Sequence, residues 1–504
     1  MKFNFKAKAA TTKNHAGAKA FKMGPELELY TAVATAGLND QFYEATDEKM
    51  IRLRELIACN DHEFVARLAV YAREQMYMRS IPLVLVVEMA KQHKGDGLVS
   101  RVATRVIQRA DEITELLSYY MMANDRAGMK QLNKLSKQLQ KGLSEAFNKF
   151  DEYQFAKYNR DTRVKLKDAL FLVHPKAKDE AQQLLFDKIA KDELQTPYTW
   201  EVELSALGQK NNDTPKVKQA ALKAKWEELI FSNKMGYMAT LRNLRNLLEA
   251  DISKEALDKV CIYLGNATAV TKSKQLPFRF LSAYRELKEL KNGRVSKVLD
   301  ALEEAVIQSA ANISGYDENT RVVIAADVSG SMQKSISAKS KVQNFDIGLM
   351  LAMLLQTRCE NVITGMFGDT WKVINVSKKN ILSNVQEFYR REGEVGYSTN
   401  GYLVIKDLLQ RDIAADKVML FTDCQLWNSN SSGETISGLW QQYKKKAPGA
   451  KLYLFDLAGY GNTPVNVMSG DVYLIAGWSD KIFNVLRALE SGTDAIDLIR
   501  QIEV

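Results

Sequence analysis

Hydrophobic residues recur at spacings of three and four along most of the first 309 residues, which is the pattern of amphipathic helices. One such set runs from Ile51 to Ile57 and another begins at Phe64. Asp61 precedes the second set and predicts a helix start, because its carboxylate can accept backbone N–H groups of the first turn. From Pro25 to about Ser309 the pattern therefore predicts paired helices and almost no strands.

A helical run of this length exceeds a single bundle. It favours an α-solenoid of HEAT-like repeats, about six or seven of roughly 40–47 residues each. Residues 1–24 are polar and basic and contain few branched apolar side chains. We expect this segment to pack as an irregular strap.

The pattern changes at Arg321, where short apolar runs begin to alternate with amphipathic helical segments. This alternation predicts a doubly wound α/β domain, a mainly parallel sheet with helices on both faces. We predict a helical domain at 1–318 and an α/β domain at 319–504. The expected strands are 321–327, 361–368, 417–423, 451–457 and 472–477, and the expected helices are 345–359, 381–391, 401–412, 434–446 and 479–490.

Composition supports a folded cytoplasmic protein. The 504 residues are 46% hydrophobic and 26% charged, which excludes a disordered chain. No apolar stretch approaches the roughly 18–20 residues of a membrane helix, and the basic N-terminus lacks the apolar core of a signal peptide. The four cysteines form no CxxC pair, so we expect reduced thiols and neither a zinc site nor a disulfide framework.

The basic surplus belongs to the first part of the chain. Residues 1–320 carry 50 Lys and Arg against 42 Asp and Glu, whereas residues 321–504 carry 20 against 19. Such asymmetry indicates a polyanionic partner for the helical part. A slightly basic domain without such a partner is the alternative.

The motif Asp327-Val328-Ser329-Gly330-Ser331 directly follows the first predicted strand of the α/β domain. It places one carboxylate and two hydroxyls at alternate positions, at the strand end where open sheets bind ligands. Thr399 and Asp423 are further oxygen donors expected at the same rim. These hard ligands suit Mg²⁺, with Mn²⁺ or Ca²⁺ as alternatives. A turn that only caps a helix remains the other interpretation.

Two groups of basic residues have helical spacing without intervening acids, so each could follow a phosphate backbone. Solvated helix faces are the alternative. The first group is Arg101, Arg105 and Arg109, and the second is Lys130, Lys134, Lys137 and Lys141.

A third basic cluster runs from Phe155 to Lys178, with seven Lys and Arg against two Asp. Tyr158 and His174 lie within it and could stack on RNA bases or hydrogen-bond to them. His174 could equally be a histidine at a helix end.

Several enzyme classes lack their signatures in this chain. There is no GxxxxGK[ST] phosphate loop and no HExxH metal motif. The α/β domain contains no histidine, which excludes a Ser-His-Asp triad built within it. Only Asp423 is expected to join Asp327 as a carboxylate, too few for two-metal nuclease chemistry. We therefore expect a binding protein and not an enzyme.

The α/β domain resembles von Willebrand factor A domains. The resemblance rests on DVSGSM after a buried strand, on a later Thr, and on a strand that ends in FTD. It implies a metal-ion-dependent adhesion site whose open position takes a carboxylate from a partner. The residues implied as ligands are Asp327, Ser329, Ser331, Thr399 and Asp423.

The helical part resembles the TROVE module in residues 14–44, 241–248 and 275–287. A TROVE module followed by an A domain is the arrangement of the Ro autoantigen family. The resemblance implies a helical-repeat ring closed by the A domain. It also implies binding of small noncoding Y RNAs on the outer surface and of single-stranded 3′ ends of misfolded RNAs in the central hole. The residues implied as Y RNA contacts are Lys157, His174 and either Arg160 or Arg163.

The leading hypothesis is a non-enzymatic, monomeric, cytoplasmic RNA-binding ring of the bacterial Ro type. It acts in RNA quality control or processing, with a ribonuclease or another protein as a further partner. The alternative is an adaptor that binds a partner's carboxylate through Mg²⁺ and uses its helical half as a protein-interaction solenoid. A metal-dependent nuclease ranks third.

Overall fold

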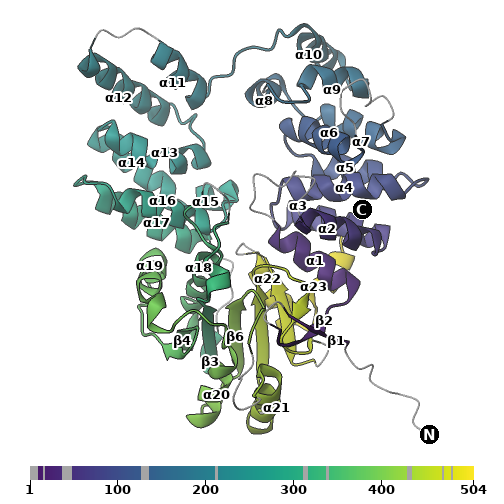
Figure 1. Ribbon diagram of the computed structural model, residues 1–504. Coiled ribbons are helices and arrows are strands. Elements are labelled where there is room, and N and C mark those ends of the chain that lie inside the picture. Colours follow the sequence, from purple (N-terminus) through teal and green to yellow (C-terminus); the bar gives the residue numbers. More distant parts are fainter. Residues whose placement is uncertain are drawn as a thin grey trace. The chain divides into compact units, whose positions relative to one another are not determined.

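The computed structural model confirms helices followed by a mixed α/β region (Figure 1). The structure describes residues 10–14, 17–36, 48–125, 135–159, 161–209, 214–309, 316–336, 340–427, 434–467, 470–477 and 481–504. The chain forms two compact units. The helical unit comprises Pro25–Lys210 and Ala495–Val504, and the mixed unit comprises Met1–Gly24 and Asn211–Asp494.

The helical unit consists of short helices that pack in sequence. Helix α3 packs on α4 and α5, α4 on α6, and α5 on α7. The last helix, α23, packs on α3 and α1. The helices are α1 (Pro25–Thr35), α2 (Glu48–Ala58), α3 (His62–Glu74), α4 (Ser80–Gln92), α5 (Leu98–Val106), α6 (Asp111–Ala123), α7 (Lys137–Phe147), α8 (Glu152–Tyr158), α9 (Leu166–Val173), α10 (Glu180–Lys191), α11 (Trp200–Gln209) and α23 (Ala495–Arg500).

The start of α3 confirms the capping prediction. The side chain of Asp61 accepts a 3.1 Å hydrogen bond from the backbone N–H of Phe64. This bond satisfies one of the N–H groups that have no partner within the helix.

A buried ion pair fixes the corner between α3, α5 and α6. The guanidinium of Arg73 donates to both oxygens of Glu112 at 2.9 and 3.0 Å, and to the carbonyl of Val106 at 2.8 Å. Glu112 is fully buried and also accepts from the backbone N–H groups of Gln108 and Arg109. The charges are therefore hydrogen-bonded as well as paired, which buried ions require.

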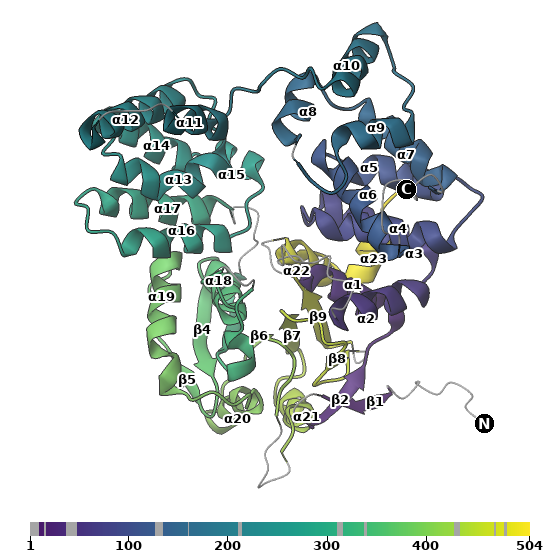
Figure 2. The ribbon, with the colours of Figure 1, turned by 45° about the horizontal axis from the view of Figure 1, so that its top comes forward.

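The mixed unit combines the later helices with the sheet domain (Figure 2). Helix α14 packs on α17, α17 on α19, and α18 over β3, β4 and β6. The helices are α12 (Pro215–Phe231), α13 (Tyr237–Glu249), α14 (Lys254–Gly265), α15 (Ala267–Ser273), α16 (Phe278–Lys288), α17 (Val295–Ser309), α18 (Asn344–Gln356), α19 (Ile381–Arg391), α20 (Tyr402–Gln410), α21 (Ile436–Lys446) and α22 (Ile482–Glu490), with 3₁₀ turns η2 (Gly330–Gln333) and η3 (Glu392–Glu394).

The main sheet has six strands in the order β5-β4-β3-β6-β7-β9 and is parallel except for β5. The parallel pairing confirms the predicted sheet. The short antiparallel edge strand was not predicted. The strands are β3 (Tyr316–Asp327), β4 (Cys359–Phe367), β5 (Trp371–Val373), β6 (Lys417–Thr422), β7 (Lys451–Asp456) and β9 (Val472–Ala476).

The prediction of an irregular N-terminal strap is wrong for the described residues 10–14 and 17–22. There, β1 (Thr11–Lys13) and β2 (Lys19–Lys22) form an antiparallel hairpin that pairs with β8 (Asn462–Thr463). Only Ala20 of the two strands is buried. Backbone pairing, and not an apolar face, holds the hairpin, so hydrophobic periodicity gave no signal.

Side-chain contacts join the helices before residue 310 to the sheet domain. Arg285 on α16 donates to both oxygens of Asp346 on α18, at 2.7 and 2.6 Å. Glu303 on α17 accepts the backbone N–H groups of Leu382 and Ser383 in the first turn of α19. These contacts place the last TROVE-like helices and the sheet in one unit. Within the described residues, none of the helices has the length and hydropathy required to cross a membrane.

Candidate functional site

The parallel sheet brings the two candidate carboxylates together. Strands β3 and β6 are neighbours, with Ala326 opposite Phe421, so Asp327 and Asp423 come at adjacent strand ends. The Thr422 hydroxyl donates to Asp327 Oδ2 at 2.6 Å, and the backbone N–H of Ser329 donates to Asp327 Oδ1 at 2.9 Å. Neither hydrogen bond caps a helix. The side chain of Asp327 therefore holds the loop that follows β3 and does not serve as a helix cap.

The other donors of the motif lie beside this carboxylate. The hydroxyls of Ser329 and Ser331 are 3.1 Å apart. Thr399 is buried and donates through its hydroxyl to the carbonyl of Gln425 at 3.0 Å. Gln425 in turn donates through its backbone N–H to Asp423 Oδ1 at 2.9 Å. A continuous hydrogen-bonded loop therefore links Thr399 to Asp423.

The second oxygen of Asp423 has the chemistry of a cation ligand. Asp423 Oδ2 is buried and has no hydrogen-bond partner among the described residues. Burial raises the pKa of this carboxyl, although the N–H of Gln425 and the Ser331 hydroxyl oppose that rise. A buried carboxylate oxygen without a partner is costly.

The pKa of the Asp327 carboxyl is raised as well. Burial, followed by the nearby charge of Asp423, raises the pKa of Asp327 to about 7. A hard cation would remove two unfavourable effects, the repulsion between the two carboxylates and the burial of an oxygen without a partner. It neutralises the charges of Asp327 and Asp423 and accepts their unused lone pairs. The donor set thus fits Mg²⁺ chemically, with two carboxylates and three hydroxyls at one edge of the sheet. Among the described residues, no cluster of three or more His, Cys, Asp and Glu side chains forms a metal site of the carboxylate-rich kind.

The first predicted cationic group does not form one helix face. Helix α5 ends at Val106, so Arg109 lies in the following connection. Arg101 is exposed, whereas Arg105 is bound to Glu74 through hydrogen bonds of 2.6 and 2.8 Å. The expectation of a single three-residue stripe is therefore wrong. The four-residue spacing of the arginines was consistent with a helix, but it did not indicate that the helix ends at Val106.

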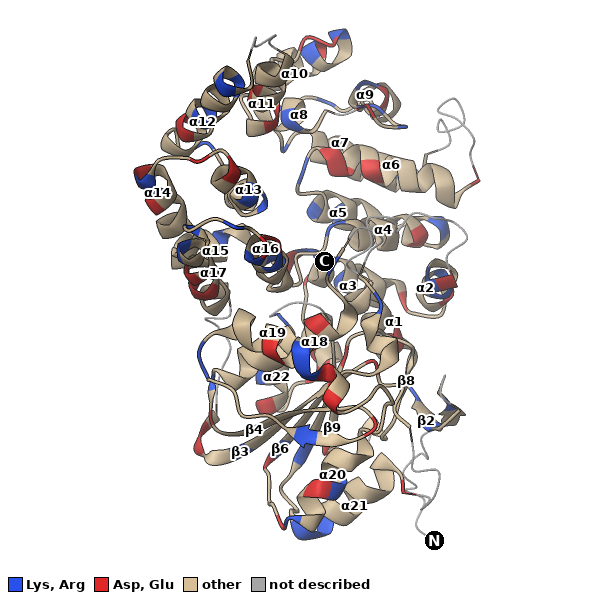
Figure 3. Ribbon diagram, turned by 60° about the vertical axis from the view of Figure 1, so that its left-hand side comes forward, with Lys and Arg blue, Asp and Glu red and all other residues tan. Residues whose placement is uncertain are grey.

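The second group is only partly described. Lys137 and Lys141 lie on α7, and both are exposed. Lys130 and Lys134 fall outside the described residues. Figure 3 shows basic and acidic residues mixed along the helices of this unit, and Glu145 also belongs to α7.

The residues of the third cluster, Phe155 to Lys178, are partly buried in the core and partly exposed on the surface. Phe155 is fully buried and stacks on Phe147, so it belongs to the core. Lys157 and Arg163 are exposed, and Arg160 lies outside the described residues. His174 is the exposed C-cap of α9 with a positive φ of 49°, as its helix-end interpretation predicts.

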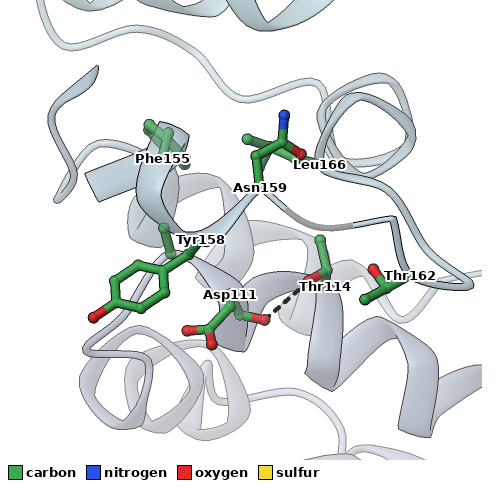
Figure 4. Close-up of a pocket in the computed structure, with 8 residues that line it drawn as sticks. Asp111, Thr114, Phe155, Tyr158, Asn159, Thr162 and Leu166 are labelled. Carbon is green, nitrogen blue, oxygen red and sulfur yellow. Dashed lines mark hydrogen bonds between the residues drawn. The ribbon is translucent and has the colours of Figure 1, made fainter. Parts of the chain in front are cut away.

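Tyr158 joins this cluster to Arg109. The guanidinium of Arg109 lies 4.3 Å from the ring centroid of Tyr158 and pairs with Asp111 at 2.7 Å. Figure 4 shows Tyr158, Asp111, Thr114 and Asn159 around a small cavity. Its volume of about 10 Å³ leaves room for no more than about one water molecule. A nucleobase cannot enter, so any RNA contact here involves side chains at the mouth.

The sequence did not indicate two hydrogen bonds that hold the candidate metal site together. One supports residues 327–331, called the metal loop below, and the other supports the neighbouring loop 423–426. Thr422, which bonds to Asp327, was included only as part of the FTD motif. Asn14 donates from the N-terminal hairpin to the carbonyl of Leu426 at 2.8 Å. No local pattern indicates such a contact, because its partners are distant in the chain.

Comparisons with known proteins agree with both halves of this architecture. The TROVE domain model matches residues 31–196 and 190–346, and the Ro60 vWA domain model matches residues 321–489. The crystal structure of the Deinococcus radiodurans RO (RSR) protein superposes with a TM-score of 0.57 at 18% identity, covering 93% of this chain and 100% of that one.

Two curated relatives are Telomerase protein component 1 of Mus musculus and of Rattus norvegicus, which are 23% and 24% identical to the chain over 356 and 328 residues. The matches cover 55% and 49% of this chain but only 13% and 12% of those longer proteins. Since the TROVE matches alone cover more than half of the residues and a Ro60-type vWA domain follows them, the chain belongs to the TROVE family, in the Ro arrangement of a TROVE domain and a von Willebrand factor A domain.

Proposed function

We propose that this protein binds RNA through its TROVE part and does not act as an enzyme. Family membership supports the proposal. The observation that carries it is the set of exposed basic side chains on the helical unit, on α5, α7, α8 and the following loop. They are Arg101, Lys137, Lys141, Lys157 and Arg163. Such residues supply the salt-dependent phosphate contacts of nucleic-acid binding.

The RNA that fits this proposal is a small noncoding, Y-like RNA. In the Ro arrangement it binds the outer surface around Lys157, while single-stranded 3′ ends of misfolded RNAs enter the central hole. The role is RNA quality control or processing, with a ribonuclease as a partner. Stacking of Tyr158 under Arg109 supplies an aromatic and cationic pair beside Lys157, which suits unpaired nucleotides.

The A domain has a separate proposed role. Mg²⁺ held by Asp327, Ser329, Ser331, Thr399 and Asp423 would bind a carboxylate of a partner. The buried, unpartnered Oδ2 of Asp423 supports this role. When bound, the ion supplies an electrophilic centre with an open position for an anionic oxygen. The five candidate ligands would hold the ion at the edge of the sheet where β3 and β6 end.

Filter binding of a structured small RNA at several salt concentrations tests the RNA proposal. Two double variants share Lys157→Ala and add either Arg160→Ala or Arg163→Ala. The quantity compared is the steepness with which the logarithm of the RNA-binding constant falls with the logarithm of the salt concentration, the salt slope. The variant that removes a true second phosphate contact should reduce this slope by about two units, and the other variant should reduce it by about one.

The matched control replaces Lys379 and Lys445, which are exposed in the A domain. It removes equal charge and should leave the slope unchanged. Equal losses in the control and in both test variants would show that only net charge matters, and would contradict a defined RNA surface.

A further inference from the structure

We infer that the candidate metal site recognises an acidic side chain flanked by apolar residues in a partner protein, and that Tyr397 and Trp427 select the flanks. The inference rests on the proposed metal site and adds its specificity. It identifies two residues of this chain that contact the partner directly.

Two exposed aromatic residues, Tyr397 and Trp427, lie close in the chain to candidate metal ligands. Among the described residues of the sheet domain, three large hydrophobic side chains are exposed: Tyr389 by 37%, Tyr397 by 50% and Trp427 by 41%. Two of the three lie within two and four positions of candidate ligands, Thr399 and Asp423. Aromatic side chains at such positions are typical anchors of protein interfaces.

Backbone hydrogen bonds attach both aromatic residues to the metal loop. The carbonyl of Tyr397 accepts from the N–H of Gly330, between Ser329 and Ser331, at 2.9 Å. The N–H of Trp427 donates to the carbonyl of Thr399 at 2.9 Å. Each aromatic residue is thus one hydrogen bond away from the segment that carries a candidate ligand.

The segment that carries Tyr397 is rigid. The N–H of Ser398 donates to Asp369 Oδ1 at 2.9 Å. Gly396 has a φ of +72°, and a Cβ at that position would lie 2.2 Å from Asp369 Oδ2. Only glycine fits this approach, so the turn is fixed. A fixed backbone holds Tyr397 in a defined position, so less conformational entropy of this segment is lost when a partner binds.

Charge favours a protein segment over RNA as the occupant. Residues 321–504 carry 20 basic and 19 acidic residues, so the sheet domain lacks the surplus that phosphate tracking requires. A carboxylate can complete the coordination of a hard cation, while neighbouring apolar side chains cover the exposed rings. RNA binding at this site is the competing outcome of the test.

The test uses the full chain, saturating Mg²⁺ and two fluorescent seven-residue peptides. Both have a central aspartate. Phenylalanine and leucine flank it in one, and serines flank it in the other. We expect the apolar-flanked peptide to bind about tenfold more tightly, because its phenylalanine and leucine cover the two exposed aromatic rings. Trp427→Ala or Tyr397→Ala should reduce this preference severalfold and leave the Mg²⁺ Kd unchanged. Tyr389→Ala is the matched control and should keep the preference.

The outcomes separate this inference from the metal proposal. If the wild type binds no Mg²⁺ by calorimetry, the metal site itself is wrong. If it binds Mg²⁺ but both peptides bind equally, or neither binds, the inferred specificity is overturned. If Trp427→Ala and Asp327→Ala both weaken binding of a single-stranded ten-nucleotide uridine RNA, the occupant is RNA and the inferred protein partner is wrong.

Discussion

The side-chain amide of Asn14 donates a 2.8 Å hydrogen bond to the backbone carbonyl of Leu426, 412 positions later in the chain. Asn14 is buried, and its Oδ1 accepts the N–H of Ala18, which closes the turn of the N-terminal hairpin. The loop that begins at Asp423 and continues through Leu426 is therefore held from outside the sheet domain's own sequence.

Asn14→Ala should loosen that loop. Removing the amide leaves the Leu426 carbonyl without its buried partner, at a cost of about 1–3 kcal/mol. We expect a lower melting temperature and a severalfold weaker Mg²⁺ Kd, measured by calorimetry. Lys13→Ala, at an exposed position next to Asn14, is the control and should change neither. An unchanged Mg²⁺ Kd in a destabilised Asn14→Ala protein would mean that the hairpin supports the fold only.

Asp327→Ala should abolish Mg²⁺ binding and leave RNA affinity largely intact. Asp327 supplies the first carboxylate, and the hydroxyls of Ser329 and Ser331 cannot offset the dehydration of Mg²⁺ by themselves. Calorimetry with Mg²⁺ and Mn²⁺ measures the loss, and circular dichroism checks folding. A folded mutant that binds the ion like the wild type would show that the motif is only a structured turn.

Stabilisation by Mg²⁺ should depend on pH. The folded state keeps a proton on Asp327 up to about pH 7, whereas the unfolded chain releases it near the ordinary pKa of 3.8. The metal-free protein therefore loses stability as the pH rises from about 4 to about 7. Mg²⁺ displaces this proton, so the ion should raise the melting temperature more at pH 8 than at pH 5.5. Asp327→Asn should remove this difference; if the difference persists, another group is responsible.

Lys137→Ala with Lys141→Ala should weaken binding of RNAs that carry a single-stranded 3′ tail more than binding of blunt hairpins. Both side chains are exposed on α7, so they can contact phosphates. Filter binding gives both affinities, and the Lys379→Ala, Lys445→Ala double variant controls for charge. Equal losses of affinity for tailed and blunt RNAs would show that these lysines attract any RNA and do not select a single strand.

Glu112→Ala should destabilise the helical unit by about 3–5 kcal/mol, because it leaves the buried guanidinium of Arg73 without its counter-charge. Glu74→Ala breaks the more exposed pair with Arg105 and should cost under about 1 kcal/mol. Urea unfolding followed by circular dichroism compares them. Similar values for the two variants would contradict the structural role of the buried pair.

The sequence alone determined the helical first part, the parallel sheet and the Asp327 loop. Each depends on local periodicity or on a strand that leads directly into a loop, and these are properties of neighbouring residues. The Asp61 cap and the helix-end position of His174 were predictable for the same reason.

Tertiary structure decided which distant residues meet. Pairing of β3 with β6 places Asp327 beside Asp423, and the packing of the helical unit places Arg109 over the ring of Tyr158. The hairpin that carries Asn14 depends on backbone pairing with β8, which leaves no hydrophobic signal in the sequence. Hydrogen bonds and ion pairs between such elements depend on distance in space, and composition or spacing along the chain does not encode that distance.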